Sequence, residues 1–170
     1  MGEGVTRIET ERLVLRPLDM DDEEALAAVL CDGLTMRWYP EPFTPSQVRE
    51  WVKRQIGRYA SDTGLLGMVE KQTGRLIGDC GAVWQDLEER TELEIAYHVN
   101  RERWNLGFAT EAAQAVIAYA FNQLGVDHVI SLIRPENVQS RRVAEKNGLV
   151  LDRVAFWHDF DHCVYKLWKK

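Results

Sequence analysis

Cysteine is scarce in this chain. Three of the 170 residues are cysteines, and no two of them stand at the two-residue spacing of zinc or redox motifs. An odd number of widely separated cysteines favours neither a disulfide framework nor a zinc site, so we expect a reducing, cytoplasmic setting and no metal. No apolar run approaches the roughly 18 residues of a membrane span, which predicts no association with a membrane.

Positive charge is also in short supply. Lysine and arginine number 21 against 27 aspartates and glutamates, which gives a net charge of −6 and a pI near 5.3. Because a nucleic-acid backbone is bound by basic surfaces, we expect no nucleic-acid partner. The first six residues fit the N-myristoylation pattern, but no basic cluster follows to supply a second anchoring signal, so we expect no lipid anchor.

The apolar residues alternate between the spacing of strands and the spacing of helices. This predicts the order β-α-α-β-β-β-α-β-α-β-β, with strands at 13–17, 65–71, 76–84, 91–99, 128–133, 150–157 and 162–168, and helices at 19–33, 44–64, 110–124 and 137–147. The order favours one mixed α/β domain over residues 1–170. Its first half should be antiparallel, and a parallel pair of strands should flank the third helix.

The fourth expected strand carries charged and apolar residues in alternation. Because side chains alternate across a strand, one face should carry Leu93, Ile95, Tyr97 and Val99, and the other Glu92, Glu94, Ala96 and His98.

The segment 104–110 joins this strand to the third helix and is the most informative part of the sequence. Small residues at Gly107 and Ala109 let a backbone approach a ligand closely, and the free N–H groups of the following helix favour an anion such as a pyrophosphate. The segment is neither a Walker A loop nor a dinucleotide-binding loop. An ordinary helix start with small residues for packing is the structural alternative.

Several segments together resemble one known family. They are Glu9–Arg16, Ile77–Asp79, Glu94–Tyr97, Gly107–Ala112 and Asn137–Gly148. In these the chain resembles the GNAT superfamily of acetyl-CoA-dependent N-acetyltransferases, in the branch of the ribosomal-protein alanine and serine N-terminal acetyltransferases. The resemblance implies a sheet splayed open between the fourth and fifth strands, acetyl-CoA as co-substrate in that opening, and a possible homodimer.

The chain departs from the family pattern at two positions. Asn105 stands where the branch commonly has glycine, and asparagine tolerates a positive φ better than most residues. Ala144 stands where many members carry a tyrosine acid, so the resemblance transfers the role next to the leaving sulfur to Ser140.

The resemblance also implies the roles of individual residues. Glu94 is the first candidate base and Asp159 the second, although a strand glutamate can simply pair with a cation and Asp159 can be a turn residue. The residues themselves, rather than the resemblance, suggest the acceptor pocket: Trp38 and Tyr39 lie in a proline-flanked loop before the second helix, although aromatic residues at such positions are often core. The coenzyme is expected to contact Tyr97, His98, Val99, Trp104, Asn105, Leu106, Gly107, Phe108, Ala109, Thr110, Asn137 and Ser140.

The segment from His158 to His162 contains several side chains that can bind a metal, but it is predicted to be a hairpin turn, so no metal site is expected there.

From the resemblance we expect an N-acetyltransferase that transfers acetyl from acetyl-CoA to a primary amine by direct attack in a ternary complex. An α-amino group is far more often neutral at pH 7 than a lysine, so a peptide N-terminus demands less of the base. The alternatives are a non-catalytic acyl-CoA-binding module and a phosphate-binding protein unrelated to the coenzyme.

Overall fold

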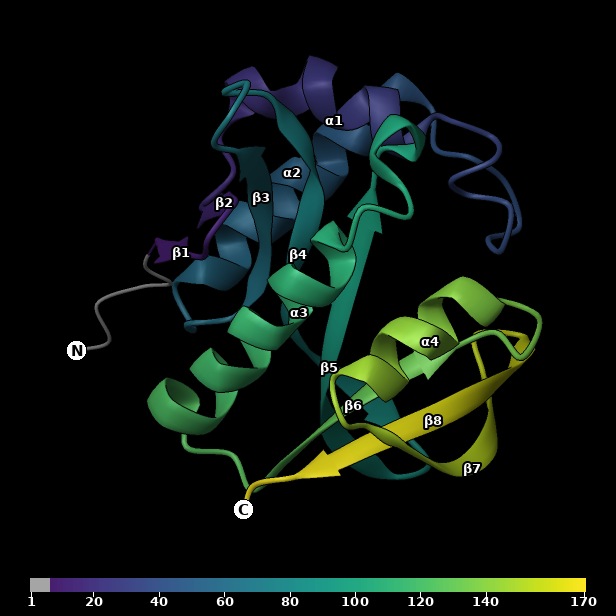
Figure 1. Cartoon of the computed structure of the whole chain (residues 1–170). Coiled ribbons are helices and arrows are strands. Elements are labelled where there is room, and N and C mark those ends of the chain that lie inside the picture. Colours follow the sequence, from purple (N-terminus) through teal and green to yellow (C-terminus); the bar gives the residue numbers. More distant parts are fainter. Residues whose placement is uncertain (1–6) are drawn as a thin grey trace.

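An eight-stranded sheet of order β1-β2-β3-β4-β5-β6-β8-β7 runs through the protein, as the computed structural model shows for residues 7–170 (Figure 1). The myristoylation pattern lies outside these described residues. The strands are β1 (Ile8–Glu9), β2 (Leu13–Arg16), β3 (Gly64–Glu70), β4 (Leu76–Leu87), β5 (Arg90–Val99), β6 (His128–Ile133), β7 (Val150–Trp157) and β8 (Phe160–Trp168). The α-helices are α1 (Glu23–Leu30), α2 (Pro45–Tyr59), α3 (Phe108–Tyr119) and α4 (Val138–Lys146). The predicted mixed α/β class is confirmed.

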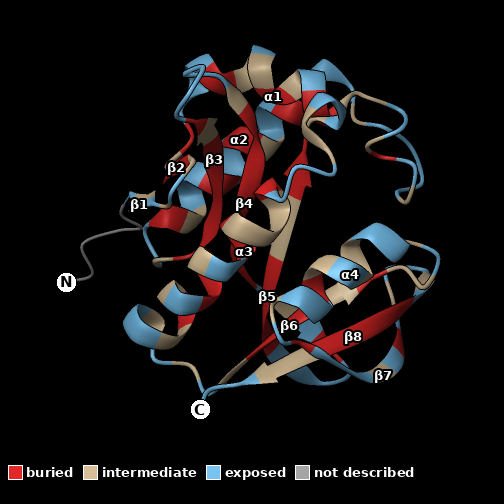
Figure 2. Ribbon diagram, in the orientation of Figure 1, coloured by how far each residue is buried: buried red, intermediate tan, exposed pale blue. Residues whose placement is uncertain are grey.

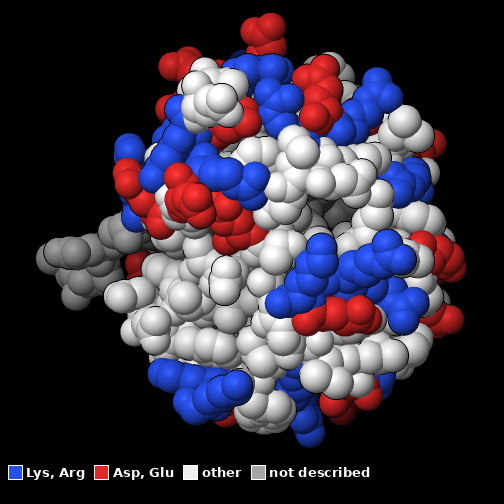
Figure 3. All heavy atoms as spheres, viewed as in Figure 1, with Lys and Arg blue, Asp and Glu red and all other residues white. Residues whose placement is uncertain are grey.

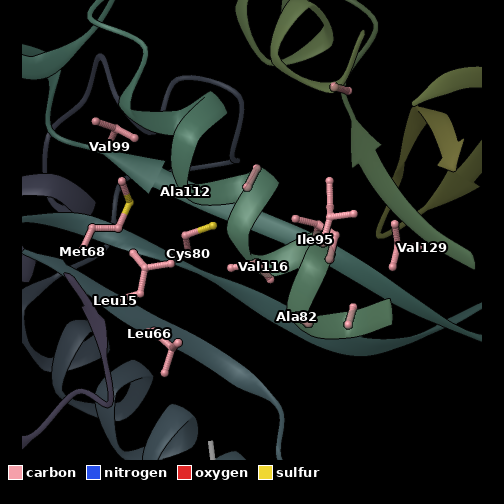
Figure 4. Packing of buried hydrophobic residues seen from close by; sticks show 14 of the residues in the cluster. Leu15, Leu66, Met68, Cys80, Ala82, Ile95, Val99, Ala112, Val116 and Val129 are labelled. Atoms are coloured by element: carbon pink, nitrogen blue, oxygen red, sulfur yellow. The ribbon is translucent and has the colours of Figure 1, made fainter. Parts of the chain in front are cut away.

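Two hydrophobic clusters lie on opposite faces of the sheet. One joins α1 and α2 through residues such as Leu26, Val29 and Val52. The other packs α3 against β2–β5, and Figure 4 shows Ala112 and Val116 of α3 beside Cys80 and Ile95. The central strands are therefore buried on both faces, whereas β7 at the edge is largely exposed (Figure 2).

The helix starts follow local sequence signals. The capping box predicted before α2 is present: the Thr44 hydroxyl accepts a hydrogen bond from the Gln47 N–H, and the Thr44 N–H donates to Gln47 Oε1. Such a cap contributes about 1 kcal/mol. Asp19 caps a 3₁₀ turn, Met20–Asp22, which precedes α1, and α1 ends at Leu30 before the predicted Gly33.

Several elements differ from the sequence prediction; α2 ends at Tyr59 rather than near Gly64, and β4 continues to Leu87. A short strand, β1, pairs with β2 and was not predicted, because two residues carry too little periodicity. The expected loop between β4 and β5 is a tight turn in which Glu88 and Glu89 both have positive φ, at 49° and 64°. The third helix begins at Phe108 rather than Thr110, and its last turn, Ala120–Leu124, is a π-helix that ends at Gly125 with φ of 69°.

The sheet opens between β5 and β6, which are the fourth and fifth strands of the prediction. These two strands run parallel and pair at one position, Glu94 opposite Ile130. Ser131 Oγ donates to the Ile95 carbonyl at 3.0 Å and holds the strands together at this end. Beyond it, no further β5–β6 pair forms within residues 7–170, and β6 continues in a ladder with β8 (Figure 1). The predicted splay is confirmed.

Within the described residues, none of the helices is both long and apolar enough to cross a membrane.

Candidate active site

The edge of β5 that faces the opening carries free main-chain groups at Tyr97. The Asn100 N–H donates to the Ile77 carbonyl on β4, whereas the Val99 carbonyl points the other way and accepts from Trp104 Nε1 at 2.8 Å. Because these directions alternate in an antiparallel ladder, the N–H and C=O of Tyr97 also point away from β4. They lie where β6 has separated, so an extended ligand can pair with them as an added strand.

The main chain of His98 lies in the β4–β5 ladder instead. His98 is opposite Asp79, and its carbonyl lies against Gly78. Tyr97, His98 and Val99 were expected to offer main-chain groups to the coenzyme. The expectation needs correction at His98, because its main-chain N–H and C=O point towards β4. At Val99 the carbonyl is already bonded to Trp104.

The loop before α3 contains two residues in the left-handed region. Asn105 has φ of 60° and Gly107 has φ of 83°, and Gly107 is the N-cap of α3. The turn thus requires the positive φ that asparagine tolerates. Asn105, Leu106 and Gly107 are exposed. The first N–H groups of α3 have no partner within the helix, so they and the helix dipole form an anion-binding end.

Arg12 fixes this loop to the start of the chain. Its Nη1 donates to the Leu106 carbonyl at 2.8 Å, its Nε donates to Glu111 Oε1 at 2.8 Å, and its guanidinium lies 4.2 Å from the centre of the Phe108 ring. Thr10 Oγ1 also donates to Glu111 Oε2, at 2.6 Å. Burial alone would raise the pKa of Glu111, but the hydrogen bonds from Thr10 and Arg12 outweigh it and hold that pKa below its ordinary value.

The start of α4 lies across the opening from β5. Asn137 is its N-cap, and Asn137 Oδ1 accepts from the Ser140 N–H at 3.2 Å. The Tyr97 hydroxyl donates to the Ser140 carbonyl at 3.2 Å and so bridges the two sides. Figure 3 shows the surface hollowed beside α4, with basic side chains gathered over that helix, whose sequence contains Arg141, Arg142 and Lys146.

Glu94 lies on the opposite face of β5 from Tyr97, as the alternation predicted. Only 8% of its surface is exposed, and Gln85 Nε2 donates to its Oε2 at 2.9 Å. Loss of water around the carboxyl raises its pKa to about 7, against the lowering effects of the Gln85 hydrogen bond and of His98. A carboxyl with this pKa exists in both protonation states near neutral pH, which suits proton transfer.

Sequence reasoning missed a series of hydrogen-bonded side chains that includes His98, on the same face of β5 as Glu94. Trp51 Nε1 donates to Asp79 Oδ2 at 2.9 Å, Asp79 Oδ1 lies 2.7 Å from His98 Nδ1, and His98 Nε2 lies 2.7 Å from the Tyr39 hydroxyl. Asp79 is completely buried and His98 is 8% exposed, whereas Tyr39 is 44% exposed. Alternation had placed His98 on the same face as Glu94, but no local signal identified Asp79 as its partner.

Trp38 and Asp159 belong to two segments that meet through Arg134. Arg134 Nη1 donates to the Trp38 carbonyl at 3.2 Å, and its guanidinium lies 4.0 Å from the centre of the Phe160 ring. Asp159, next to Phe160, is exposed in the β7–β8 turn with φ of 69°. The α1–α2 connection and this turn therefore adjoin on one side of the opening. No group of three or more potential metal ligands is found within residues 7–170.

Comparisons with known proteins give a family model and relatives that this chain matches. Residues 12–150 match the family model described as an acetyltransferase (GNAT) domain. Among curated relatives, the uncharacterized protein YkkB of Bacillus subtilis (strain 168) is 36% identical over 146 residues, which cover 85% of each chain.

Solved structures share the fold over nearly the whole chain. An acetyltransferase from Agrobacterium tumefaciens str. C58 has a TM-score of 0.82 and 26% identity, with 99% of this chain and 98% of that chain covered. A ribosomal L7/L12 α-N-protein acetyltransferase in complex with coenzyme A has a TM-score of 0.78, with 95% of this chain and 97% of that chain covered. At 15% identity, this second likeness is one of fold alone.

Proposed function

The chain belongs to the GNAT acetyltransferase family and is an acyltransferase, and we propose that it transfers acetyl from acetyl-CoA to an α-amino group of a peptide or to another small primary amine. The observation that carries the proposal is the main-chain edge at Tyr97, which faces the opening between β5 and β6, together with the loop before α3, which Trp104 joins to β5 through the Val99 carbonyl. An acyl-pantetheine arm and a pyrophosphate need these two features together.

The residues around the opening fit such a co-substrate. The N–H groups of Phe108, Ala109 and Thr110 at the start of α3 would hold the pyrophosphate, because they lack partners within the helix. Asn137 would contact the pantetheine chain, and the basic residues of α4 supply positive charge beside the hollow for the remaining phosphate (Figure 3). The coenzyme bound to the solved L7/L12 acetyltransferase supports the choice of ligand.

Glu94 is the proposed first proton acceptor. Its pKa of about 7 makes the carboxylate available at neutral pH while it remains basic enough to take a proton from an α-ammonium group, directly or through one water. An α-amino group has a pKa near 7.8, so the two groups are closely matched, whereas a lysine near 10.4 is not. Asp159 in the β7–β8 turn is the second candidate and would act at the outer side of the acceptor site.

The Tyr97 N–H is the proposed donor to the thioester oxygen, where negative charge develops during attack. The Ser140 hydroxyl, in the first turn of α4, is the proposed hydrogen-bond donor to the departing sulfur. Because a thiolate with a pKa near 8.5 departs without full protonation, the contribution of Ser140 is modest.

A thiol-release assay over a panel of peptides, polyamines and aminoglycosides tests the proposal. Steady release with any acceptor supports it, and tight acetyl-CoA binding without release indicates a non-catalytic module instead. With an active acceptor, Glu94→Gln is expected to lower kcat/KM about tenfold or more and to remove the rise of the rate through about pH 7. An unchanged pH profile would exclude Glu94 as the base.

A further inference from the structure

Two hydrogen bonds link Asp79 to His98 and His98 to Tyr39, and these residues come from three separate segments of the protein. Asp79 is on β4, His98 is on β5 and Tyr39 is in the α1–α2 connection. An ionised carboxylate can only accept, so the proton between Asp79 and His98 belongs to Nδ1. When Nδ1 carries the only ring proton, Nε2 accepts from the Tyr39 hydroxyl, and the Tyr39 oxygen can then accept a hydrogen bond from another donor.

The Tyr39 end of these hydrogen bonds lies within the electrostatic influence of Glu94. His98 and Glu94 lie on the same face of β5, and Ala96 stands between them, about 7 Å from each along the strand. Ala96 has a small side chain and is only partly buried. Loss of water around the Tyr39 hydroxyl, together with the negative charges of Glu94 and Asp79, raises its pKa, so Tyr39 remains un-ionised.

Acetylation of an ammonium acceptor releases two protons from nitrogen. An ammonium group has three N–H bonds and the amide product has one. The first proton must leave before attack, to free the electron pair that forms the C–N bond. The second leaves the nitrogen of the tetrahedral intermediate as the C–S bond breaks, its electron pair departing with sulfur. The sulfur takes up one proton, so the net release to water is one.

We propose that Tyr39, His98 and Asp79 form a relay that takes this second proton, a role that rests on the proposed acetyl transfer. Tyr39 contacts the acceptor nitrogen and is the catalytic residue, whereas His98 and Asp79 act through it. The proton moves from nitrogen to the Tyr39 oxygen while the tyrosine proton passes to His98 Nε2. Tyr39 ends neutral, and the imidazolium is stabilised by the Asp79 carboxylate.

The proton transfer depends on the charges around His98. Asp79 faces it from β4, Tyr39 from the α1–α2 connection and Glu94 from its own strand, and Arg58 of α2 adds positive charge near Glu94. Trp51, the contact from α2, carries no charge but fixes Asp79 Oδ2. When the relay takes the second proton, Glu94 already holds the first, so Asp79 is the carboxylate that lies against the imidazolium.

The first experiment compares two acceptors, an α-amino peptide and an alkoxyamine that is already neutral at pH 7. The neutral acceptor has no first proton to lose, so the effect of Glu94→Gln should disappear with it. The effect of Tyr39→Phe should persist, with kcat lowered about tenfold or more for both acceptors. Tyr119→Phe, which also removes a hydroxyl that donates to a main-chain carbonyl, is the matched control and should retain wild-type kcat.

His98→Gln provides a second variant in case Tyr39→Phe loosens the α1–α2 connection. It should show the same loss of kcat with both acceptors. Its affinity for acetyl-CoA, measured by calorimetry, should equal that of the wild type. Wild-type kcat in Tyr39→Phe or in His98→Gln would overturn the relay while leaving the acetyltransferase proposal intact. An enzyme that releases no thiol with any amine would overturn both.

The second experiment observes the ring directly and needs no turnover. Long-range ¹H–¹⁵N spectra, with His98→Gln for assignment among the four histidines, report which ring nitrogen carries the proton. The relay requires a protonated Nδ1 and a bare Nε2 at about pH 7.5. A proton on Nε2 throughout about pH 6 to 9 would overturn it, because such a ring cannot accept from Tyr39.

Discussion

Arg12 and Glu111 are 99 positions apart in the sequence and form an ion pair at 2.8 Å, between Nε and Oε1, that ties the residue before β2 to the first turn of α3. Glu111 also accepts hydrogen bonds from Thr10 Oγ1 and from the Arg12 N–H. Two of the segments that carry the family resemblance are therefore in contact. Their shared role is to hold the loop in front of α3 in place.

Glu111→Gln is expected to destabilise the protein by about 2 kcal/mol at pH 7, because a half-buried carboxylate loses charge-assisted hydrogen bonds. The pKa of Glu111 is lowered on folding, so its stabilisation is present above the ordinary value near 4.5 and is lost as pH falls through the lowered pKa. Urea unfolding at neutral and acidic pH measures the difference. Glu50→Gln, at an exposed pair with Lys53, is the control and should change nothing. Equal effects of the two variants would contradict the assignment.

Glu94 should make the protein less stable as pH rises from about 4.5 to 7. Its pKa is raised on folding, so its contribution is fully present below the ordinary pKa and disappears as the pH passes through about 7. The difference between 4.5 and about 7 corresponds to roughly 3 kcal/mol at most. Glu94→Gln should remove this slope and unfold at higher urea concentration than the wild type at about pH 8. The same slope in both proteins would show that the carboxyl ionises normally.

Gly107→Ala should weaken acetyl-CoA binding several-fold. The residue has φ of 83°, and an added Cβ would lie 3.3 Å from an Arg12 nitrogen, so the side chain that holds the Leu106 carbonyl must shift. Gly74→Ala is the matched control, since Gly74 has φ of 71° with open space around it in the β3–β4 turn. Both variants should lose about 1 kcal/mol of stability from backbone strain. Only Gly107→Ala should raise the KM for acetyl-CoA, and an equal rise in both would argue against a coenzyme loop here.

Asn105 should be replaceable by glycine but not by valine. Its φ of 60° is accessible to glycine and asparagine, whereas a β-branched side chain is strained there. Asn105→Gly should therefore keep the KM for acetyl-CoA within about twofold, because recognition is through main-chain N–H groups. Asn105→Val should raise it several-fold. Loss of affinity in Asn105→Gly would mean that the asparagine side chain itself contacts the coenzyme.

Ser140→Ala should lower kcat only a few-fold, with little change in the KM for the acceptor, because a departing thiolate needs little help from a donor. The N–H and C=O of Ser140 are bonded to Asn137 and Tyr97 and remain so after the substitution. A rapid-quench measurement of the acetyl-transfer step shows whether the chemical step has slowed. A loss of several hundredfold would mean that the hydroxyl is an obligatory acid.

Local patterns in the sequence were enough to predict most elements of the fold. The Thr44–Gln47 capping box, the alternation along β5 and the limits of β6 and β7 depend on residues a few positions apart, so they can be read without knowing the tertiary structure. The splayed sheet was predicted from the family resemblance instead. No periodicity of single strands shows where two neighbours separate.

The tertiary structure alone decided which distant residues meet. Tyr39, Asp79 and His98 are brought together by the order of strands in the sheet and by the position of the α1–α2 connection, and Arg12 finds Glu111 in the same way. The burial that gives Glu94 its raised pKa also comes from segments remote in sequence. Neighbouring residues determine the local backbone, but the solvation and hydrogen-bond partners of a side chain depend on elements packed against it, and the chemistry of this site depends on those partners.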